Sequence, residues 1–205
     1  MKGNELVWRT LADAALNDRR RWKNVGEIAD SAGVASRTGY LALEKLIEIG
    51  AVERRSPSGI AVTNPEKVLT VLAAWRNLGR DRIATTSLDA VRPLLDISRR
   101  PYAIGGPDAA IQYLDSWNNV SSRGKRLVYL PSDAVVSELP KGEEVIVLAM
   151  DKRAQRDWRS GYSSLAQTYA DLFALPGWEA EEFRRALWSR HFSAPDWDQK
   201  GRIDD

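Results

Sequence analysis

The chain has 205 residues, of which 43% are hydrophobic and 28% are charged, and its formal net charge is only +2. This composition is typical of a globular protein with room for one large or two small domains, and no apolar run is long enough to cross a bilayer. The absence of cysteine excludes disulfides, thiolate metal sites and cysteine nucleophiles.

Nothing in the sequence indicates secretion or a bound cofactor. The start, MKGNELVWRT, lacks the hydrophobic segment of a secretory signal, so we expect a cytoplasmic protein. Any histidine-based metal site or triad would have to use the single histidine, His191, and a lone late histidine is more typical of a helix end. We therefore expect neither a metal nor another cofactor.

Charge is distributed unevenly along the chain. Residues 1–80 hold 13 Lys and Arg against 9 Asp and Glu, whereas residues 81–205 hold 17 against 19. The N-terminal part therefore carries the positive field, which is where a DNA-binding surface would need it.

Apolar spacing predicts three helices in the first fifty residues. Trp8, Leu11 and Ala15 recur at the spacing of a helix that buries one face. A second, short helix is expected over 25–33, and a third over 36–49. Two helices joined by a short turn that contains glycine form a helix-turn-helix unit.

The third predicted helix carries the candidate DNA-reading residues on the face opposite its apolar stripe. In a helix-turn-helix, the N-terminal residues of the second helix reach base edges. There Arg37 can bind a guanine through two hydrogen bonds, and Leu41 can contact a thymine methyl group. Ser36 and Thr38 are candidates for bases or phosphates, and Lys45 lies on the same exposed face.

Three residues of this helix do not fit the simplest DNA-binding pattern. Gly39 lies where a helix-turn-helix commonly has a β-branched core residue, which costs roughly 1 kcal/mol of helix propensity, and we expect it to allow a closer helix contact. Glu44 and Glu48 lie on the exposed face, where they would repel phosphates.

The next segment predicts a basic hairpin. The strands AVERR and IAVT alternate in polarity and are joined by residues 56–59, Ser-Pro-Ser-Gly, the favoured pattern of a type I turn. Arg54 and Arg55 lie beside the tip and Ser58 lies in the turn, so all three are candidate DNA contacts. The connection NDRRRWKN adds three candidates for the phosphate backbone, namely Arg20, Arg21 and Lys23.

Helices followed at once by a basic hairpin resemble the winged helix-turn-helix family of bacterial regulators. The resemblance covers residues 5–63, and the stretch LEKLIEIGAVERR carries most of it. It implies that the hairpin is a wing that contacts phosphates or the minor groove. Winged helices also serve as protein–protein modules, and exposed helix faces are often charged only because they are solvated.

A further helix and a boundary follow the hairpin. Asn64 as N-cap and Pro65 at the first helical position predict a helix that ends at Gly79. The region 79–100 is the expected boundary between domains. We therefore expect a DNA-binding domain with a linking helix over 1–80, a second domain over 81–192, and a disordered tail over 193–205.

The second half has the alternation of predicted strands and helices that is typical of a mixed α/β domain. PYAIGG, RLVYLP and EEVIVLAMD predict strands, and PDAAIQYLDSW predicts a helix. Residues 163–192 predict two helices that are separated at Pro176 and Gly177. The predicted fold class is α+β, with an N-terminal winged helix-turn-helix followed by a mixed α/β domain with C-terminal helices.

The sequence does not favour an enzyme. A turn at Gly105 and Gly106 before a helix can bind phosphate through backbone N–H groups, but the glycine-rich nucleotide-binding patterns are absent. A lone turn of this kind is usually only a turn. No Asp-x-Asp pair of a nucleotidyltransferase follows it, and Asp196 and Asp198 lie near the tail in an unsuitable setting.

Together with the predicted wing, the second half resembles the antitoxins of abortive-infection (AbiE-type, type IV) toxin–antitoxin systems. YAIGGPDAAIQYL, RLVYLP and QTYADLFALPGWEAEEFRRAL carry this resemblance, with Tyr169, Asp171 and Leu172 at the positions of a family segment. It implies a DNA-binding antitoxin that represses its own operon, with a nucleotidyltransferase toxin as a partner that it need not touch stably. By spacing alone, Tyr169, Leu172 and Phe173 indicate a core-facing helix.

Two other functions remain open from the sequence. A ligand-sensing repressor would bind a small molecule in the α/β half, and that ligand would stabilise the folded state. A winged-helix protein–protein interaction module would show no salt-dependent affinity for double-stranded DNA.

Overall fold

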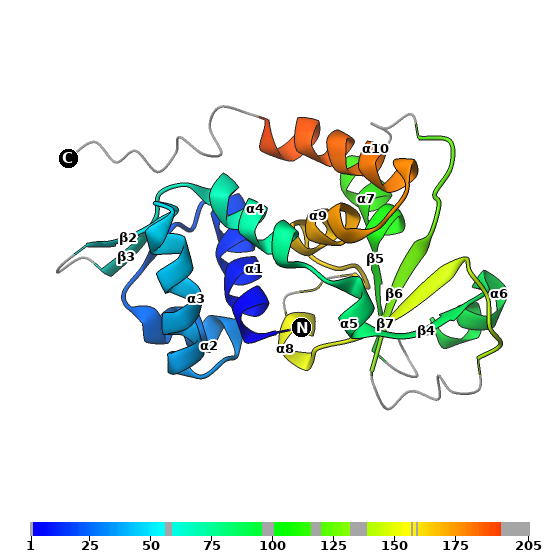
Figure 1. Cartoon of the computed structure of the whole chain (residues 1–205), viewed down its shortest axis with the longest axis horizontal. Coiled ribbons are helices and arrows are strands. Elements are labelled where there is room, and N and C mark those ends of the chain that lie inside the picture. The colour runs from blue at the N-terminus through cyan, green and yellow to red at the C-terminus, as the bar shows by residue number, and fades with distance from the viewer. Residues whose placement is uncertain are drawn as a thin grey trace. The chain divides into compact units, whose positions relative to one another are not determined.

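The computed structural model describes residues 2–55, 59–95, 101–115, 120–131, 139–156, 158 and 160–193, and the fold over these residues is α+β. The chain forms two compact units, Met1–Trp75 with Ser189–Asp205, and Arg76–Trp188 (Figure 1). The division falls between Trp75 and Arg76, ahead of the expected boundary. The expected disordered tail lies almost entirely outside the described residues.

Four helices form the framework of the first unit. They are α1 (Gly3–Leu16), α2 (Val25–Ala32), α3 (Ser36–Glu48) and α4 (Pro65–Trp75). The helix predicted from the spacing of Trp8, Leu11 and Ala15 and the helices predicted over 25–33 and 36–49 are therefore confirmed. Helix α1 packs against each of the other three and buries most of its length, including Leu6, Trp8 and Leu11.

Two local features hold α3 in place. The buried indole of Trp8 on α1 donates a hydrogen bond to the carbonyl oxygen of Ala42 at 2.9 Å. Gly39 is buried against α2, where an added Cβ would lie 3.1 Å from Val25 Cγ1 and 3.2 Å from Ala29 Cβ. The close contact expected at Gly39 is thus present.

A three-stranded antiparallel sheet completes the first unit. Its strands are β1 (Arg21–Trp22), β2 (Val52–Arg55) and β3 (Gly59–Val62), in the order β1-β3-β2. The predicted hairpin is present, with Val52 opposite Val62 and Arg55 opposite Gly59. Its turn, residues 56–58, lies outside the described residues. The cationic connection contributes β1, a short strand that the sequence did not predict.

Helix α4 begins as predicted but ends earlier. The side chain of Asn64 accepts a hydrogen bond from the backbone N–H of Lys67 at 2.9 Å, and Pro65 opens the helix. The expected end at Gly79 is wrong, because Asn77 caps a new short helix, α5 (Leu78–Asp81), through the N–H of Arg80.

The second unit is built on a mixed four-stranded sheet. Its strands are β4 (Arg82–Thr86), β5 (Ala103–Gly105), β6 (Arg126–Leu130) and β7 (Val145–Ala149), in the order β4-β7-β6-β5. Only β6 and β7 are parallel neighbours. Strands β5, β6 and β7 confirm the predicted strands, and β4 is additional.

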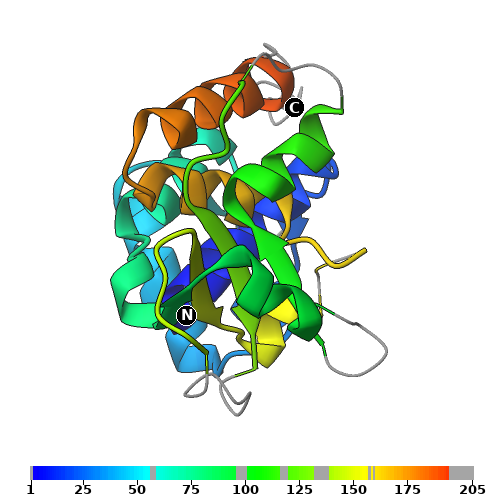
Figure 2. The ribbon, with the colours of Figure 1, turned by 90° about the vertical axis from the view of Figure 1, so that its right-hand side faces the viewer.

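Helices cover both faces of this sheet (Figure 2). On one face, Val128 and Val147 pack with residues of α6 (Leu88–Val91) and the 3₁₀ turn η1 (Arg92–Leu94). On the other lie α7 (Gly106–Leu114) and α9 (Leu165–Ala174), which also pack against α10 (Trp178–Leu187). The short helix α8 (Lys152–Gln155) follows β7, and a π-helical turn η2 (Trp188–Phe192) follows α10. None of the helices in the described part of the chain has the length and apolar character that a bilayer crossing requires.

We expect Gly39→Val to lower the free energy of unfolding by about 1–3 kcal/mol, because the added side chain would overpack the contact between α2 and α3. Urea denaturation followed by circular dichroism measures the loss. Glu44→Val is the control, since it places the same side chain at an exposed position of α3. Equal losses in the two variants would contradict a tight contact at Gly39.

Candidate nucleic-acid interface

Helix α3 presents one continuous exposed stripe. Its buried face includes Gly39, Ala42, Leu43 and Leu46, which pack into the first unit. Seven residues on the opposite side are exposed at helical spacing: Ser36, Arg37, Tyr40, Leu41, Glu44, Lys45 and Glu48. Thr38 is only partly exposed. The predicted division of α3 into a buried and an exposed face is therefore confirmed.

The two ends of this stripe differ in charge. The N-terminal half carries Arg37 and the neutral side chains of Tyr40 and Leu41, which are 49% and 52% exposed. The positive end of the helix dipole adds to the field there. The C-terminal half carries Glu44 and Glu48 around Lys45, so its net charge is negative.

The carboxylates in the C-terminal half do not stabilise α3. Glu44 and Glu48 are four residues apart, and such like-charge pairs destabilise a helix by about 0.2–0.5 kcal/mol. Glu48 also lies in the last turn, where the helix dipole disfavours negative charge. The ion pair of Lys45 Nζ with Glu48 Oε2, at 3.5 Å, joins two exposed side chains and contributes little.

Arg54 of the hairpin reaches α3. Its guanidinium lies 5.9 Å from the centroid of the Tyr40 ring, at the limit of a cation–π contact. The neighbouring Arg55 lies 3.4 Å from a carboxylate oxygen of Glu53. Among the described residues, no ion pair engages Arg37 or Arg54. Both side chains are exposed, so an external anion can reach them.

The three candidate phosphate contacts in the cationic connection differ in their exposure. Arg21 and Lys23 are exposed on and beside β1, the edge strand next to β3. Arg20 is only 7% exposed, which argues against its predicted contact with the phosphate backbone. Arg19 is exposed instead, stacked 3.7 Å from the Trp22 ring centroid and 2.8 Å from Glu27.

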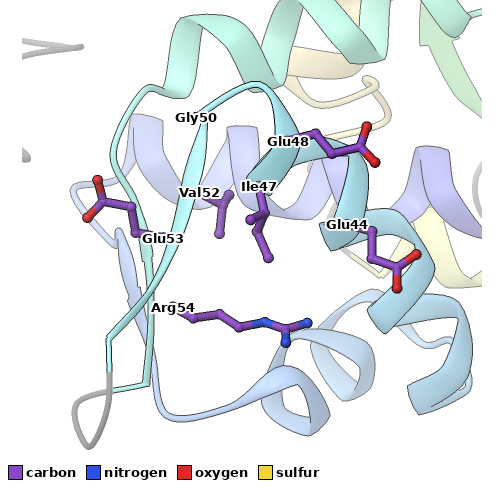
Figure 3. A pocket seen from close by; sticks show the side chains of 7 residues that line it. All are labelled: Glu44, Ile47, Glu48, Gly50, Val52, Glu53 and Arg54. Atoms are coloured by element: carbon purple, nitrogen blue, oxygen red, sulfur yellow. The ribbon is translucent and has the colours of Figure 1, made fainter.

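A shallow hollow separates the C-terminal half of α3 from β2 (Figure 3). Ile47 and Val52 lie at its centre, and the Arg54 side chain extends beneath Ile47 toward α3. Glu44 and Glu48 project from α3, whereas Glu53 points to the opposite side of β2. The hollow is lined by Glu44, Ile47, Glu48, Gly50, Val52, Glu53 and Arg54.

Most of the predicted contacts lie on α3 and on the strands of the three-stranded sheet. Arg37 and Leu41 are exposed on the N-terminal half of α3. Arg54 extends from β2 to the Tyr40 ring and also lines the hollow beside the C-terminal half of α3. Lys45 lies farther along α3 beside two carboxylates. Ser58 lies outside the described residues. Sequence reasoning missed Tyr40, although its place one turn after Arg37 on the exposed stripe could have indicated it.

The second unit contains a buried polar network rather than an open site. Arg76 donates from Nε to Asp171 Oδ1 at 2.7 Å, from Nη1 to Asp81 Oδ2 at 2.5 Å, and from Nη2 to the Tyr129 hydroxyl at 3.1 Å. Tyr129 donates to Asp171 Oδ2 at 2.6 Å. Gln167 Nε2 donates to Asp171 Oδ1 at 2.8 Å. The network joins α5, β6 and α9.

Protonation states in this network follow from burial and pairing. Burial lowers the pKa of Arg76, but Tyr129 and the two aspartates outweigh it and hold that pKa well above its ordinary value. Burial raises the pKa of Tyr129 well above its ordinary value, although Arg76 opposes the shift. Burial by itself would raise the pKa of Asp81. The positive charge of Arg76 outweighs burial, so the pKa of Asp81 lies below its ordinary value. Arg76 is therefore charged and Tyr129 neutral at neutral pH.

The motif residues of the second half are mostly structural. Tyr169 and Leu172 are buried as helical spacing predicted, but Phe173 is exposed and is not a core residue. Asp171, which the spacing did not assign to the core, is also buried. At Gly105, an added Cβ would lie 3.2 Å from Asp171 Oδ2. A carboxylate thus lies against the Gly105–Gly106 turn, which argues against a phosphate site there. Within the described parts of the chain, no three acidic or histidine side chains come together as a metal site requires.

Comparison with protein-family models, with curated proteins and with solved structures finds no match to this chain.

We expect Tyr129→Phe to lower the free energy of unfolding by about 1–3 kcal/mol, because it leaves buried polar atoms of Asp171 and Arg76 without a partner. Urea denaturation followed by tryptophan fluorescence measures this change. Tyr40→Phe, which removes a hydroxyl from an exposed ring, is the control. Indistinguishable midpoints for the two variants would contradict a stabilising role of the network.

Proposed function

We propose that the chain is a DNA-binding transcriptional regulator and that the first unit is a winged helix-turn-helix. In this proposal α3 is the recognition helix and the β2–β3 hairpin is the wing. The observation that carries the proposal is that Arg37 and Leu41 are exposed on the N-terminal half of α3, while Arg54 extends from β2 to the Tyr40 ring on the same exposed stripe. No ion pair among the described residues neutralises either arginine.

Each residue of this surface has a chemical role in the proposal. Arg37, at the N-terminus of α3, reads a guanine in the major groove, and Leu41 contacts a thymine methyl group. Arg54, Arg55, Arg21 and Lys23 bind backbone phosphates, which position the protein without specifying sequence. Arg20 is not part of this surface.

We further propose that the regulator is an autorepressing antitoxin of a type IV toxin–antitoxin system. The support is the resemblance of segments in the second half to AbiE-type antitoxins. The partners would then be double-stranded DNA of its own promoter and a nucleotidyltransferase toxin, without a need for stable contact between the two proteins.

The direct test is a titration of the protein against the duplex upstream of its own reading frame and against a scrambled duplex, at two salt concentrations. We expect the upstream duplex to bind about a thousandfold more tightly or better, in the range of specific DNA readers. Equal affinities with no salt dependence would contradict the proposal and would favour a protein–protein module.

Two variants distinguish the recognition of base sequence from the binding of backbone phosphates. We expect Arg37→Ala to cost about 1–3 kcal/mol on the upstream duplex and to relax sequence preference. Arg54→Ala combined with Arg55→Ala should instead weaken binding to both duplexes and reduce the salt slope by up to about two. Arg82→Ala, at an exposed arginine of the second unit, is the matched control. An unchanged preference in Arg37→Ala would rule out α3 as the reader.

A further inference from the structure

The charge of the exposed stripe of α3 changes between Leu41 and Glu44. Before this point the stripe offers Arg37 and uncharged side chains, and after it Glu44 and Glu48 flank a single Lys45. The Lys45 ammonium lies 3.5 Å from Glu48, so the one cation of this half is already paired. Only half of the stripe is therefore suited to a polyanion.

The position of the two carboxylates has no explanation in the stability of α3. They repel one another across one helical turn, and Glu48 faces the negative end of the helix dipole. Neither side chain contributes to the buried face of the helix. Together with Arg54 of β2 they line the hollow beside α3, and they add negative charge to the field that an approaching phosphate meets there.

We propose that Glu44 and Glu48 are specificity residues that weaken the binding of α3 to non-cognate DNA; this inference rests on the proposed DNA-binding function. Binding to non-cognate DNA is almost wholly electrostatic and allows many orientations, so the whole stripe meets phosphates. Cognate binding inserts the N-terminal end of α3 into the major groove, which fixes the orientation and keeps the two carboxylates farther from the backbone. The repulsion therefore weakens non-cognate binding more than cognate binding. Repulsive groups of this kind raise the ratio of cognate to non-cognate affinity.

The experiment compares Glu44→Gln combined with Glu48→Gln against a control that removes two exposed carboxylates of the second unit, Glu143→Gln combined with Glu182→Gln. Both pairs of substitutions change the net charge equally. We expect the α3 variant to bind scrambled duplex about tenfold more tightly at low salt, with a salt slope steeper by up to about two. Its affinity for the upstream duplex should rise less than about threefold, and the control should change neither.

Four results would overturn the inference. An equal gain on both duplexes, or a gain no larger than that of the control, would show that the carboxylates do not discriminate. A loss of affinity for the upstream duplex alone would instead identify Glu44 or Glu48 as an acceptor that reads a base. If the wild-type protein shows no preference for the upstream duplex, the proposed function itself fails and the inference fails with it. Circular dichroism checks that α3 keeps its helix in both variants.

Discussion

The candidate interface depends on the burial of one face of α3. The Trp8 indole donates a hydrogen bond to the carbonyl oxygen of Ala42. Gly39 allows α2 to pack closely against α3, because a side chain at this position would crowd Val25. These contacts fix the rotation of α3 about its own axis. Once the rotation is fixed, the side chains that remain exposed are fixed too, and the exposed stripe follows from the packing rather than from its own interactions.

The functional information lies in the arrangement of charge and not in its total. A net charge of +2 on 205 residues says little about a polyanionic partner. On the surface, however, the cations fall into two groups. Arg55 and Lys45 have carboxylate neighbours, whereas Arg37 and Arg54 have no ion pair among the described residues. Arg37 also lies at the end of α3 that the helix dipole makes positive. This distribution favours an anion at one end of α3 and disfavours it at the other.

Much of the first unit could be predicted from the sequence, because its signals are local. Apolar periodicity defined three helices, and the hairpin followed from alternating strands around a turn. The predictions that failed concern residues whose placement depends on partners far away in the chain. Arg20 occurs in a run of arginines that looks uniformly exposed, and only the folded environment buries it. Strand β1 has two residues and exists only through its pairing with β3.

The second unit was less predictable for the same reason. RIATT shows no clear alternation of polarity, and β4 is defined by its pairing with β7. The network around Arg76 joins residues as far apart in the chain as Asp171, so no local pattern could indicate it. In the sequence, Asp171 stands out only as a position of the segment that resembles the antitoxins, and no local pattern indicates its ion pair with Arg76.

The most direct measurement of the DNA-binding surface is an NMR titration of uniformly ¹⁵N-labelled protein with the duplex upstream of its reading frame. The account predicts that the largest changes in backbone amide shifts fall on residues 36–41 and on the hairpin strands. Smaller changes should extend to residues 21–23. Shifts confined to the unit Arg76–Trp188, or no shifts at stoichiometric duplex, would contradict the assignment of α3 and the hairpin as a DNA-binding surface.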